Sequence, residues 1–480
     1  MIQFLLNNTL IKEAHLDPNL TLLNYLRRRR QRCGTKEGCA SGDCGACTVT
    51  LGRVVAGRIR YETVNSCLTL VSTLQGRQLI TVEDLRQGTA LHPVQQAMVD
   101  CHASQCGFCT PGFVMSLFCL QKQDGDKHRH QIEQALAGNL CRCTGYRPIV
   151  EAAQQLCAQP SSDSFDQQEA DIVRRLQALQ NDEPDELTDG VNRCFMPKSV
   201  AQLAQVYLQY PQAKLVAGGT DLSLSITQHY QALPQLIALE HVAELKQCAE
   251  NDSDFQLGAA ASLDHCAQFL ASRIPAFSDI LQRFASLQVR HQGTLGGNLA
   301  NASPVGDSSP LLLALNASLR LQRGARLREL PLDQFFTGYR QTRLEEGEFI
   351  HSILIPKQGV SADFAAWKVA KRLDDDISAV SGAFNVHLAE GRISAAYIAY
   401  GGLAATPKRA YACEAALIGQ PLTIASVEQA CHALAEDFQP LSDFRASAAY
   451  RLTVAANLLR RYVLRHHGEL AVTEVSRYVS

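Results

Sequence analysis

The fold is decided by the stretch Gly38-Cys39-Ala40-Ser41-Gly42-Asp43-Cys44-Gly45-Ala46-Cys47. Its three cysteines are spaced C-x4-C-x2-C, and Cys67 follows after a gap of 19 residues. This is the plant-type ferredoxin spacing, in which four thiolates hold a [2Fe–2S] cluster. The glycines let the backbone turn closely and direct N–H groups at the sulfurs. The stretch therefore predicts an iron–sulfur loop that the remote Cys67 closes.

A second set of four cysteines, with a different spacing, follows along the chain. Cys106 and Cys109 are spaced C-x2-C, and after 31 residues Cys141 and Cys143 are spaced C-x-C. Four thiolates also suit a tetrahedral zinc ion, and zinc sites more often carry paired C-x2-C units, so zinc stays an alternative, mainly for this set. A disulfide framework fits poorly, because the chain is long, has 17 cysteines and shows no secretory leader. Two cluster sites on one chain suggest a path for single electrons.

Composition and charge exclude several classes of protein. The 480 residues are 46% hydrophobic and 19% charged, and the net charge of −2 argues against nucleic acid as the main partner. No apolar run reaches about 18 residues, so we expect no membrane span and a cytoplasmic protein. The basic run Arg27–Arg32 follows an amphipathic stretch and indicates the charged end of a helix.

The pattern of strands and helices indicates several domains, since 480 residues exceed one hydrophobic core. Short strands alternate with one helix around the first cysteine loop. Two helix–loop–helix pairs surround the second set, with helices predicted at 93–103, 111–123, 130–137 and 146–157. A polar stretch predicts a linker with a helix near Ala170–Gln180, and Ala379–Leu388 with Ile393–Tyr400 predicts a hairpin. We expect domains at 1–87, 88–158, 191–360 and 361–480, with the linker at 159–190.

Three further stretches carry weaker signals for a flavin. Leu215–Leu222 is an apolar strand that runs into a Gly-Gly-Thr-Asp turn, whose N–H groups can cradle a pyrophosphate, although a plain strand and turn fits as well. It is not the G-x-G-x-x-G fingerprint, so a Rossmann site is not supported. Gly293–Asp307 packs glycines, hydroxyls and amides into a short loop, which indicates a phosphate or ribose site or a polar structural loop. Lys368–Asp376 sets cations beside carboxylates, as surface clusters also do.

These stretches occur in the order found in a known family. The cysteine stretches are Gly38–Cys47, Gln105–Gly112 and Asn139–Pro148, and the others are Gly218–Asp221, Leu295–Asn298 and Arg372–Ile377. On these residues the chain resembles the molybdenum hydroxylase family, and within it the small subunits of bacterial xanthine dehydrogenases. The resemblance covers nearly the whole chain and favours iron over zinc at the second cysteine set.

The resemblance implies a multidomain α+β fold. Its parts are a ferredoxin-like β-grasp [2Fe–2S] domain, a four-helix [2Fe–2S] domain, an FAD-binding domain of the vanillyl-alcohol-oxidase type and a C-terminal α+β flavoprotein domain. Asp375 matches a carboxylate near the flavin and the nicotinamide and is the candidate catalytic residue, while Gln105 and Cys143 match positions that approach the pterin of the molybdenum cofactor. The implied FAD contacts are Leu215, Val216, Ala217, Gly218, Gly219, Thr220, Asp221, Leu222, Thr294, Gly297, Asn298, Ser303, Asp307, Leu354 and Lys368, with Phe284 and Ala285 near the flavin ring.

Family members on one chain continue into a long molybdenum-binding region, whereas this chain ends at Ser480. The resemblance therefore implies a separate large subunit with the molybdenum cofactor, in a heterotetramer of two small and two large chains. Electrons from purine oxidation (hypoxanthine to xanthine to urate) then pass through the second cysteine set, the first set and FAD to NAD⁺. The alternatives are another molybdenum hydroxylase, such as an aldehyde or nicotinate dehydrogenase, O₂ as final acceptor, and a zinc-stabilised scaffold protein.

Overall fold

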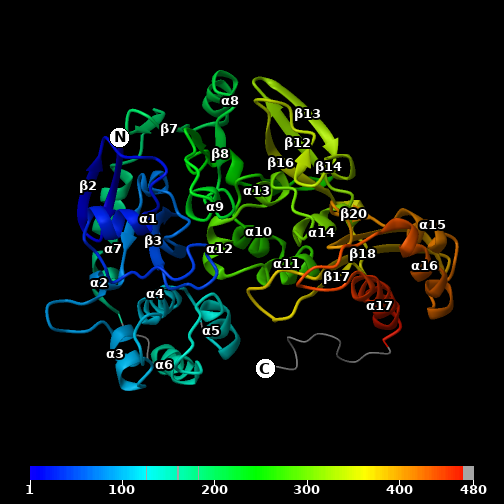
Figure 1. The fold of residues 1–480 in the computed structure, drawn as a ribbon, viewed down its shortest axis with the longest axis horizontal. Helices are drawn as coiled ribbons and strands as arrows, with labels where there is room; N and C mark the ends of the chain where they lie inside the picture. The colour runs from blue at the N-terminus through cyan, green and yellow to red at the C-terminus, as the bar shows by residue number, and fades with distance from the viewer. Residues whose placement is uncertain (126, 159–161, 182, 469–480) are drawn as a thin grey trace. The chain divides into compact units, whose positions relative to one another are not determined.

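The computed structural model describes residues 1–125, 127–158, 162–181 and 183–468 (Figure 1). Residues 159–161 and 182 of the predicted linker, and 469–480 of the predicted last domain, lie outside the described residues. The chain forms two compact units. One consists of Met1–Val242 and Ala285–Gly293, and the other of Ala243–Phe284 and Thr294–Ser480.

The first unit begins with a five-stranded sheet in the order β2-β1-β5-β3-β4. Phe4, Leu51 and Val64 are buried beneath it together with Tyr25 from the helical turn that follows β2. That turn ends in the predicted basic run, so its cations lie at the negative end of the helix dipole. The elements are β1 (Ile2–Leu6), β2 (Thr9–Glu13), α1 (Leu22–Asn24), the π-helical turn Tyr25–Arg29, β3 (Thr48–Val55), β4 (Arg58–Asn65) and β5 (Gln78–Ile80).

Four helices around the second cysteine set follow, each within a few residues of its predicted range. Their apolar faces bury Met98, Phe113, Phe118 and Ile149 in one core. The short α2 (Val82–Leu85) leads into them, and the four are α3 (Pro93–Asp100), α4 (Thr110–Gln121), α5 (Arg129–Leu136) and α6 (Arg147–Ala158).

The predicted linker carries a helix, α7 (Ser164–Gln177), which is packed and not solvated. Its residues Ile172 and Leu176 are buried against Leu5 and Ile59 of the first sheet. The linker helix was therefore correctly predicted as a helix, but its apolar face ties it to the first domain.

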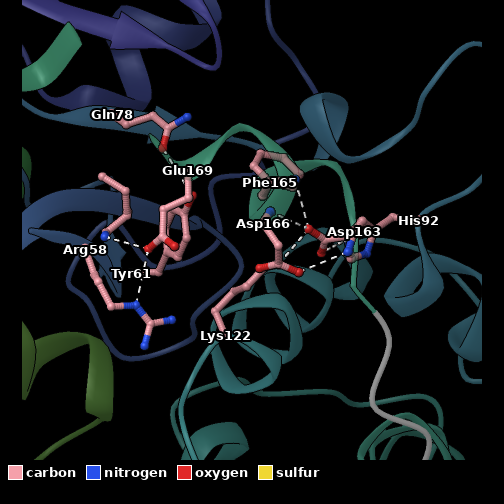
Figure 2. Close-up of polar contacts among 10 residues, drawn as sticks. Arg58, Tyr61, Gln78, His92, Lys122, Asp163, Phe165, Asp166 and Glu169 are labelled. Carbon is pink, nitrogen blue, oxygen red and sulfur yellow. Dashed lines mark hydrogen bonds and ion pairs between the residues drawn. The ribbon is translucent and has the colours of Figure 1, made fainter. Parts of the chain in front are cut away.

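The N-terminus of α7 is held by a buried ionic cluster, which Figure 2 shows. Asp163 caps the helix by accepting from the N–H of Phe165 at 2.9 Å. The same carboxylate binds the ring of His92 at 2.7 Å and the ammonium of Lys122 at 2.6 Å. The aromatic rings of Phe118 and Phe165 flank the lysine and the histidine. The cluster joins the start of α7 to the start of α3, where His92 is the N-cap, and to the end of α4, where Lys122 is the C-cap.

The first unit ends with a four-stranded sheet in the order β6-β7-β9-β8, in which β7, β9 and β8 run parallel. Its residues Cys194, Met196, Val216 and Leu236 share one core with the first sheet. The elements are β6 (Asp185–Thr188), β7 (Arg193–Met196), α8 (Val200–Gln209), β8 (Lys214–Val216), α9 (Leu224–Thr227) and β9 (Gln235–Ala238), with α12 (Leu287–Gln292) returning from later in the chain.

The second unit contains an antiparallel sheet in the order β10-β11-β16-β12-β13. Leu257, Phe277, Leu312 and Ile353 are buried between this sheet and its helices. The elements are β10 (Cys248–Glu250), β11 (Asp254–Gly258), α10 (Leu263–Leu270), α11 (Pro275–Gln282), α13 (Leu295–Ala300), α14 (Ser308–Ala314), β12 (Ser318–Arg323), β13 (Arg326–Pro331), β14 (Phe336–Gly338), β15 (Gln341–Thr342) and β16 (Phe349–Pro356).

A second sheet of this unit, β17-β18-β19-β20, includes the predicted hairpin, which is confirmed. Phe384, Tyr400 and Tyr462 lie in the core between the sheet and three helices. The elements are β17 (Ala365–Val369), β18 (Val380–Ala389), β19 (Arg392–Gly401), β20 (Lys408–Arg409), α15 (Tyr411–Leu417), α16 (Ile424–Asp437) and α17 (Ala448–His466). No helix among the described residues combines the length and apolar character needed to cross a bilayer.

Candidate functional site

The four cysteines of the first set lie together in the first unit. Thiol–thiol hydrogen bonds join Cys39 to Cys44 and Cys67, and join Cys47 to Cys67. Cys47 and Cys67 are buried, while Cys39 and Cys44 are half-buried. The loop bends around the sulfurs through several residues with positive φ, among them Gly42 at 86°. Cys67, which is predicted as the fourth ligand, therefore lies beside the thiols of the loop.

Hydrogen bonds within the first set make two of its thiols easier to ionise and two harder, because they lower the pKa of Cys39 and Cys47 and raise the pKa of Cys44 and Cys67. Hydrogen bonds from the thiols of Cys44 and Cys67 hold the pKa of Cys39 well below its ordinary value. The backbone N–H of Ser41 lies 3.4 Å from the Cys39 sulfur and acts in the same direction. A hydrogen bond from Cys67 also lowers the pKa of Cys47, although burial opposes it. Thiolates are the form that binds metals, and N–H groups aimed at sulfur stabilise their charge.

The second set forms two thiol pairs. The sulfurs of Cys143 and Cys106 are 3.5 Å apart, and the Cys109 thiol hydrogen-bonds with Cys141. Burial raises the pKa of Cys141, but hydrogen bonds, chiefly from Thr144, lower it by more. The pKa of Cys141 is therefore below its ordinary value. Cys106 and Cys143 are exposed, unlike any cysteine of the first set. One pair therefore lies at the surface of the helical domain.

Pairs of thiols suit a two-iron cluster. Within the described ranges, no group of three or more His, Cys, Asp or Glu side chains is placed to hold a single metal ion. A [2Fe–2S] cluster is a larger object than one ion and takes two thiolates on each iron. The contacts of Cys106 with Cys143 and of Cys109 with Cys141 give two such pairs. The donor set of eight thiols fits two clusters of this kind.

The Gly-Gly-Thr-Asp turn after β8 lies against the first cysteine set. The hydroxyl of Ser223 donates to the carbonyl of Leu68 at 2.7 Å, and Leu68 directly follows Cys67. Further along, the Gln228 amide donates to the carbonyls of Cys39 and its neighbour at 3.1 and 3.0 Å. The segment after the predicted pyrophosphate turn therefore forms hydrogen bonds at or beside Cys39 and Cys67.

The same turn is closely packed on its other side. A Cβ at Gly218 would lie 1.9 Å from the carbonyl oxygen of Gln292, so no larger residue fits there. Gln292 ends α12, and its side chain accepts from Thr69 at 3.0 Å. Gly219 has a φ of 73°, which glycine adopts without strain. This packing gives a physical reason for both glycines of the turn.

Several of the other predicted flavin contacts come together in the second unit. Lys368 on β17 and Asp307 at the start of α14 form a buried ion pair of 2.6 Å. The other carboxylate oxygen of Asp307 accepts from Ser378 at 2.5 Å. Asn298 accepts from Ser308, the next residue after Asp307, at 2.5 Å. The ion pair and the hydrogen bonds gather three of the predicted flavin residues, Asn298, Asp307 and Lys368, in one buried polar group.

The remaining predicted residues are placed as follows. Thr294 caps α13 by accepting from the N–H of Gly297 at 3.1 Å, and Leu354 is buried in β16. Asp375 has a φ of 49°, and its carbonyl accepts from Arg372 at 3.1 Å. Gln105 is exposed beside Cys106. The predicted FAD residues fall in both units: Leu215–Leu222 and Ala285 in the first, and Phe284, Thr294, Gly297, Asn298, Ser303, Asp307, Leu354 and Lys368 in the second.

Sequence reasoning missed several polar residues that support these sites. Ser223 binds the carbonyl of Leu68 next to Cys67, and Gln228 binds the carbonyl of Cys39. Gln288 of α12 is fully buried in a polar network with Asn139. Asn139 begins the stretch Asn139–Pro148, but its spacing to the cysteines does not predict which residues it hydrogen-bonds with. Arg283 donates to the carbonyl of Leu373 in the loop before Asp375, and burial lowers its pKa. Nothing in the sequence around Arg283 separates it from a surface arginine.

Comparison with known proteins gives three family models along the chain. They are a [2Fe-2S] binding domain at 81–154, an FAD binding domain in molybdopterin dehydrogenase at 189–358, and a CO dehydrogenase flavoprotein C-terminal domain at 365–466. The first of them contains the second cysteine set, and the first cysteine set lies before it. The predicted α+β multidomain fold with iron–sulfur, FAD-binding and C-terminal flavoprotein domains is confirmed.

Individual relatives agree with these matches. Xanthine dehydrogenase of Drosophila subobscura is 33% identical over 98% of this chain and 39% of its own length. Aldehyde oxidase 1 of Bos taurus is 29% identical over 96% of this chain and 39% of its own length, so the chain spans about two fifths of these relatives. A solved chain of carbon monoxide dehydrogenase from Hydrogenophaga pseudoflava, in a form described as lacking the Mo-pyranopterin moiety of the molybdenum cofactor, is 30% identical. It superposes with a TM-score of 0.52 over 55% of this chain and 93% of its own.

Proposed function

Because the chain belongs to the molybdenum hydroxylase family, we propose that it is the electron-transfer subunit of a xanthine dehydrogenase. The chain is an iron–sulfur and FAD region of an oxidoreductase of this family. On our proposal, the chain is the small subunit of a bacterial enzyme that oxidises purines with NAD⁺ as the electron acceptor. The relative with 33% identity supports the purine substrate.

One observation carries the proposal. The backbone N–H of Leu140 donates to the carbonyl of Cys44 at 3.0 Å, and Leu140 directly precedes Cys141. A ligand of the first set is thus one hydrogen bond from the neighbour of a ligand of the second. On the other side of the first set, Ser223 binds the neighbour of Cys67. The order second set, first set, flavin turn follows from these contacts and supports a relay in that direction.

The electron count of the reaction fits the parts of the chain. Hydroxylation of a purine C–H by water, from hypoxanthine to xanthine to urate, releases two electrons and two protons in each step. The chain conducts the electrons singly, because each [2Fe–2S] cluster carries one at a time. FAD accepts one or two electrons and so supplies hydride chemistry when it is bound. NAD⁺ takes both electrons and one proton, and the second proton enters solvent.

The residues proposed for each cofactor are those predicted from the sequence. Cys39, Cys44, Cys47 and Cys67 hold one [2Fe–2S] cluster, and Cys106, Cys109, Cys141 and Cys143 hold the other. The turn at Gly218 and the buried Asp307–Lys368 pair bind FAD. Asp375 lies near the nicotinamide.

The molybdenum cofactor, on this proposal, is bound by a separate large subunit that docks at the second cysteine set. The exposed side chains of Cys106, Cys143, Phe108 and Leu140 support this, because an exposed apolar rim around an electron carrier suits a partner surface. Gln105 faces the same partner and its pterin. The assembly we propose is a cytoplasmic heterotetramer of two small and two large chains.

Metal and flavin analysis of the purified chain is the first test. About four irons and one flavin per chain support the relay, whereas two zincs without visible absorption would establish the scaffold alternative. Purine-driven NADH formation by the complex with its large subunit then tests the substrate. Turnover of an aldehyde or of nicotinate, with none of a purine, would assign the chain to another molybdenum hydroxylase. The aldehyde oxidase relative makes that second candidate specific.

A further inference from the structure

The two cysteine loops meet backbone to backbone at one place in the first unit. The Leu140 N–H donates to the Cys44 carbonyl at 3.0 Å. Beside it, a Cβ on Gly45 would lie 2.2 Å from the carbonyl oxygen of Gly138, so only glycine permits this approach. From the sulfur of Cys44 to that of Cys141 the connection consists of covalent bonds and this single hydrogen bond.

Asn139 lies at the centre of this contact. It is 2% exposed and directly precedes Leu140. Its Nδ2 donates to the carbonyl of Gly45 at 3.0 Å and to the hydroxyl of Thr48 at 3.2 Å, both in the first domain. Its Oδ1 accepts from Ser116 of α4 at 2.6 Å and from Gln288 of α12 at 3.1 Å.

Every hydrogen-bonding atom of this amide is therefore used, and each end faces a different part of the fold. The nitrogen binds the loop that carries Cys44 and Cys47, and the oxygen binds the helical domain and α12. A buried amide with fixed partners at both ends has one orientation, since turning it over would face donors to donors. The segment it belongs to cannot shift relative to the first loop without breaking these bonds.

We propose that Asn139 is a positioning residue that sets the distance, and with it the electronic coupling, between the two cluster sites. The inference rests on the proposed function, because it requires both cysteine sets to hold [2Fe–2S] clusters. Asn139 touches neither set of sulfurs. It acts by fixing the Cys44–Leu140 peptide contact.

The test is Asn139→Asp, which exchanges one NH₂ group for an oxygen at constant shape. The new oxygen takes the place of Nδ2, which donates to the Gly45 carbonyl at 3.0 Å. Two oxygens at this distance repel each other, so we expect the two loops to move apart. The matched control is Asn65→Asp. Asn65 is 1% exposed, and its Nδ2 donates to the carbonyl of Gly42 at 2.8 Å, within the first domain alone.

The readouts are iron content, the electron paramagnetic resonance of the fully reduced chain, and the rate of electron transfer between clusters after rapid one-electron reduction. We expect N139D to retain about four irons per chain and both cluster signals, with a smaller magnetic splitting between them and slower transfer. We expect N65D to change the signal or potential of the first cluster while the splitting stays as in the wild type.

Each outcome decides the question. Unchanged splitting and transfer rate in N139D would overturn the inference, and so would an equal loss of splitting in N65D. If N139D yields no folded chain, Thr48→Val removes one acceptor of the Asn139 amide without adding charge, and a splitting equal to the wild type there also overturns it. A wild-type chain that contains zinc in place of iron would instead refute the proposed function.

Discussion

The buried ion pair of Lys368 and Asp307 gives the sharpest prediction for stability. The Lys368 side chain is 1% exposed and that of Asp307 is 5% exposed, with 2.6 Å between ammonium and carboxylate. Lys368→Met keeps the length and apolar stem of the side chain and removes the charge. Asp307 then keeps its hydrogen bond from Ser378 but loses its counter-charge in a core that water does not reach.

The magnitude follows from the desolvation of the remaining carboxylate. Removing one partner of a buried pair costs about 3–5 kcal/mol, because the other charge is left uncompensated. For a folding unit of this size, a loss of 1 kcal/mol lowers the melting temperature by about 2–4 °C. We therefore expect Lys368→Met to melt about 6–20 °C below the wild type.

Urea unfolding and calorimetry of the purified chain, each followed with and without added FAD, measure this. The double variant Lys368→Met/Asp307→Asn is the control, since it removes both charges and keeps an acceptor for Ser378. It should recover most of the lost stability, because replacing a whole buried pair by neutral groups is often close to neutral. A single variant within about 1 kcal/mol of the wild type, or a double variant no more stable than the single one, would refute the reasoning.

Three further predictions follow from the first unit. Cys44→Ala should remove one cluster signal, lower the iron content to about two per chain and stop NAD⁺ reduction while flavin stays bound, and normal turnover would contradict the relay. Gly218→Ala should release flavin on gel filtration, because its methyl group would overlap the Gln292 carbonyl. Burial raises the pKa of Asp163, but hydrogen bonds from His92 and from the ammonium of Lys122 lower it by more. The pKa of Asp163 therefore lies below its ordinary value. Its stabilisation is then complete above about pH 4 and lost as the pH falls towards the folded pKa. D163N should flatten the acid side of the stability–pH curve, which thermal melts between about pH 5 and about pH 2 check.

The sequence predicts what depends on short spacing. The four helices around the second cysteine set and the hairpin around Glu390 follow from local periodicity and turn residues, and the structure has them within a few residues. The first cysteine loop was predictable for the same reason, because three of its thiols lie within nine residues. The position of Cys67 beside this loop is expected only because its spacing is characteristic of one cluster type, and its role as a ligand stays a prediction.

Side-chain partners far apart in the chain carry no such signal. Gln288 binds Thr48 across 240 residues and Ser116 across 172, and neither contact is visible in a single sequence. The packing of α7 on the first sheet is a contact of this kind, because the polar composition of the stretch gives no sign that Ile172 and Leu176 are buried against Leu5 and Ile59. The return of α12 into the first unit follows from packing of this kind and not from any local preference.

The burial of the two cysteine sets supports the proposed direction of the relay independently of the family. Cys47 and Cys67 are 2% and 3% exposed, whereas Cys106 and Cys143 are exposed at the surface. Electron transfer requires close approach, so an external donor can reach the second set but not the buried end of the first. The segment after the Gly218 turn contacts the first set through Ser223. On the proposed function, the first set therefore passes its electrons to the flavin. The second cysteine set is, on the same proposal, the entry point for electrons, because its exposed pair Cys106 and Cys143 lies at the surface.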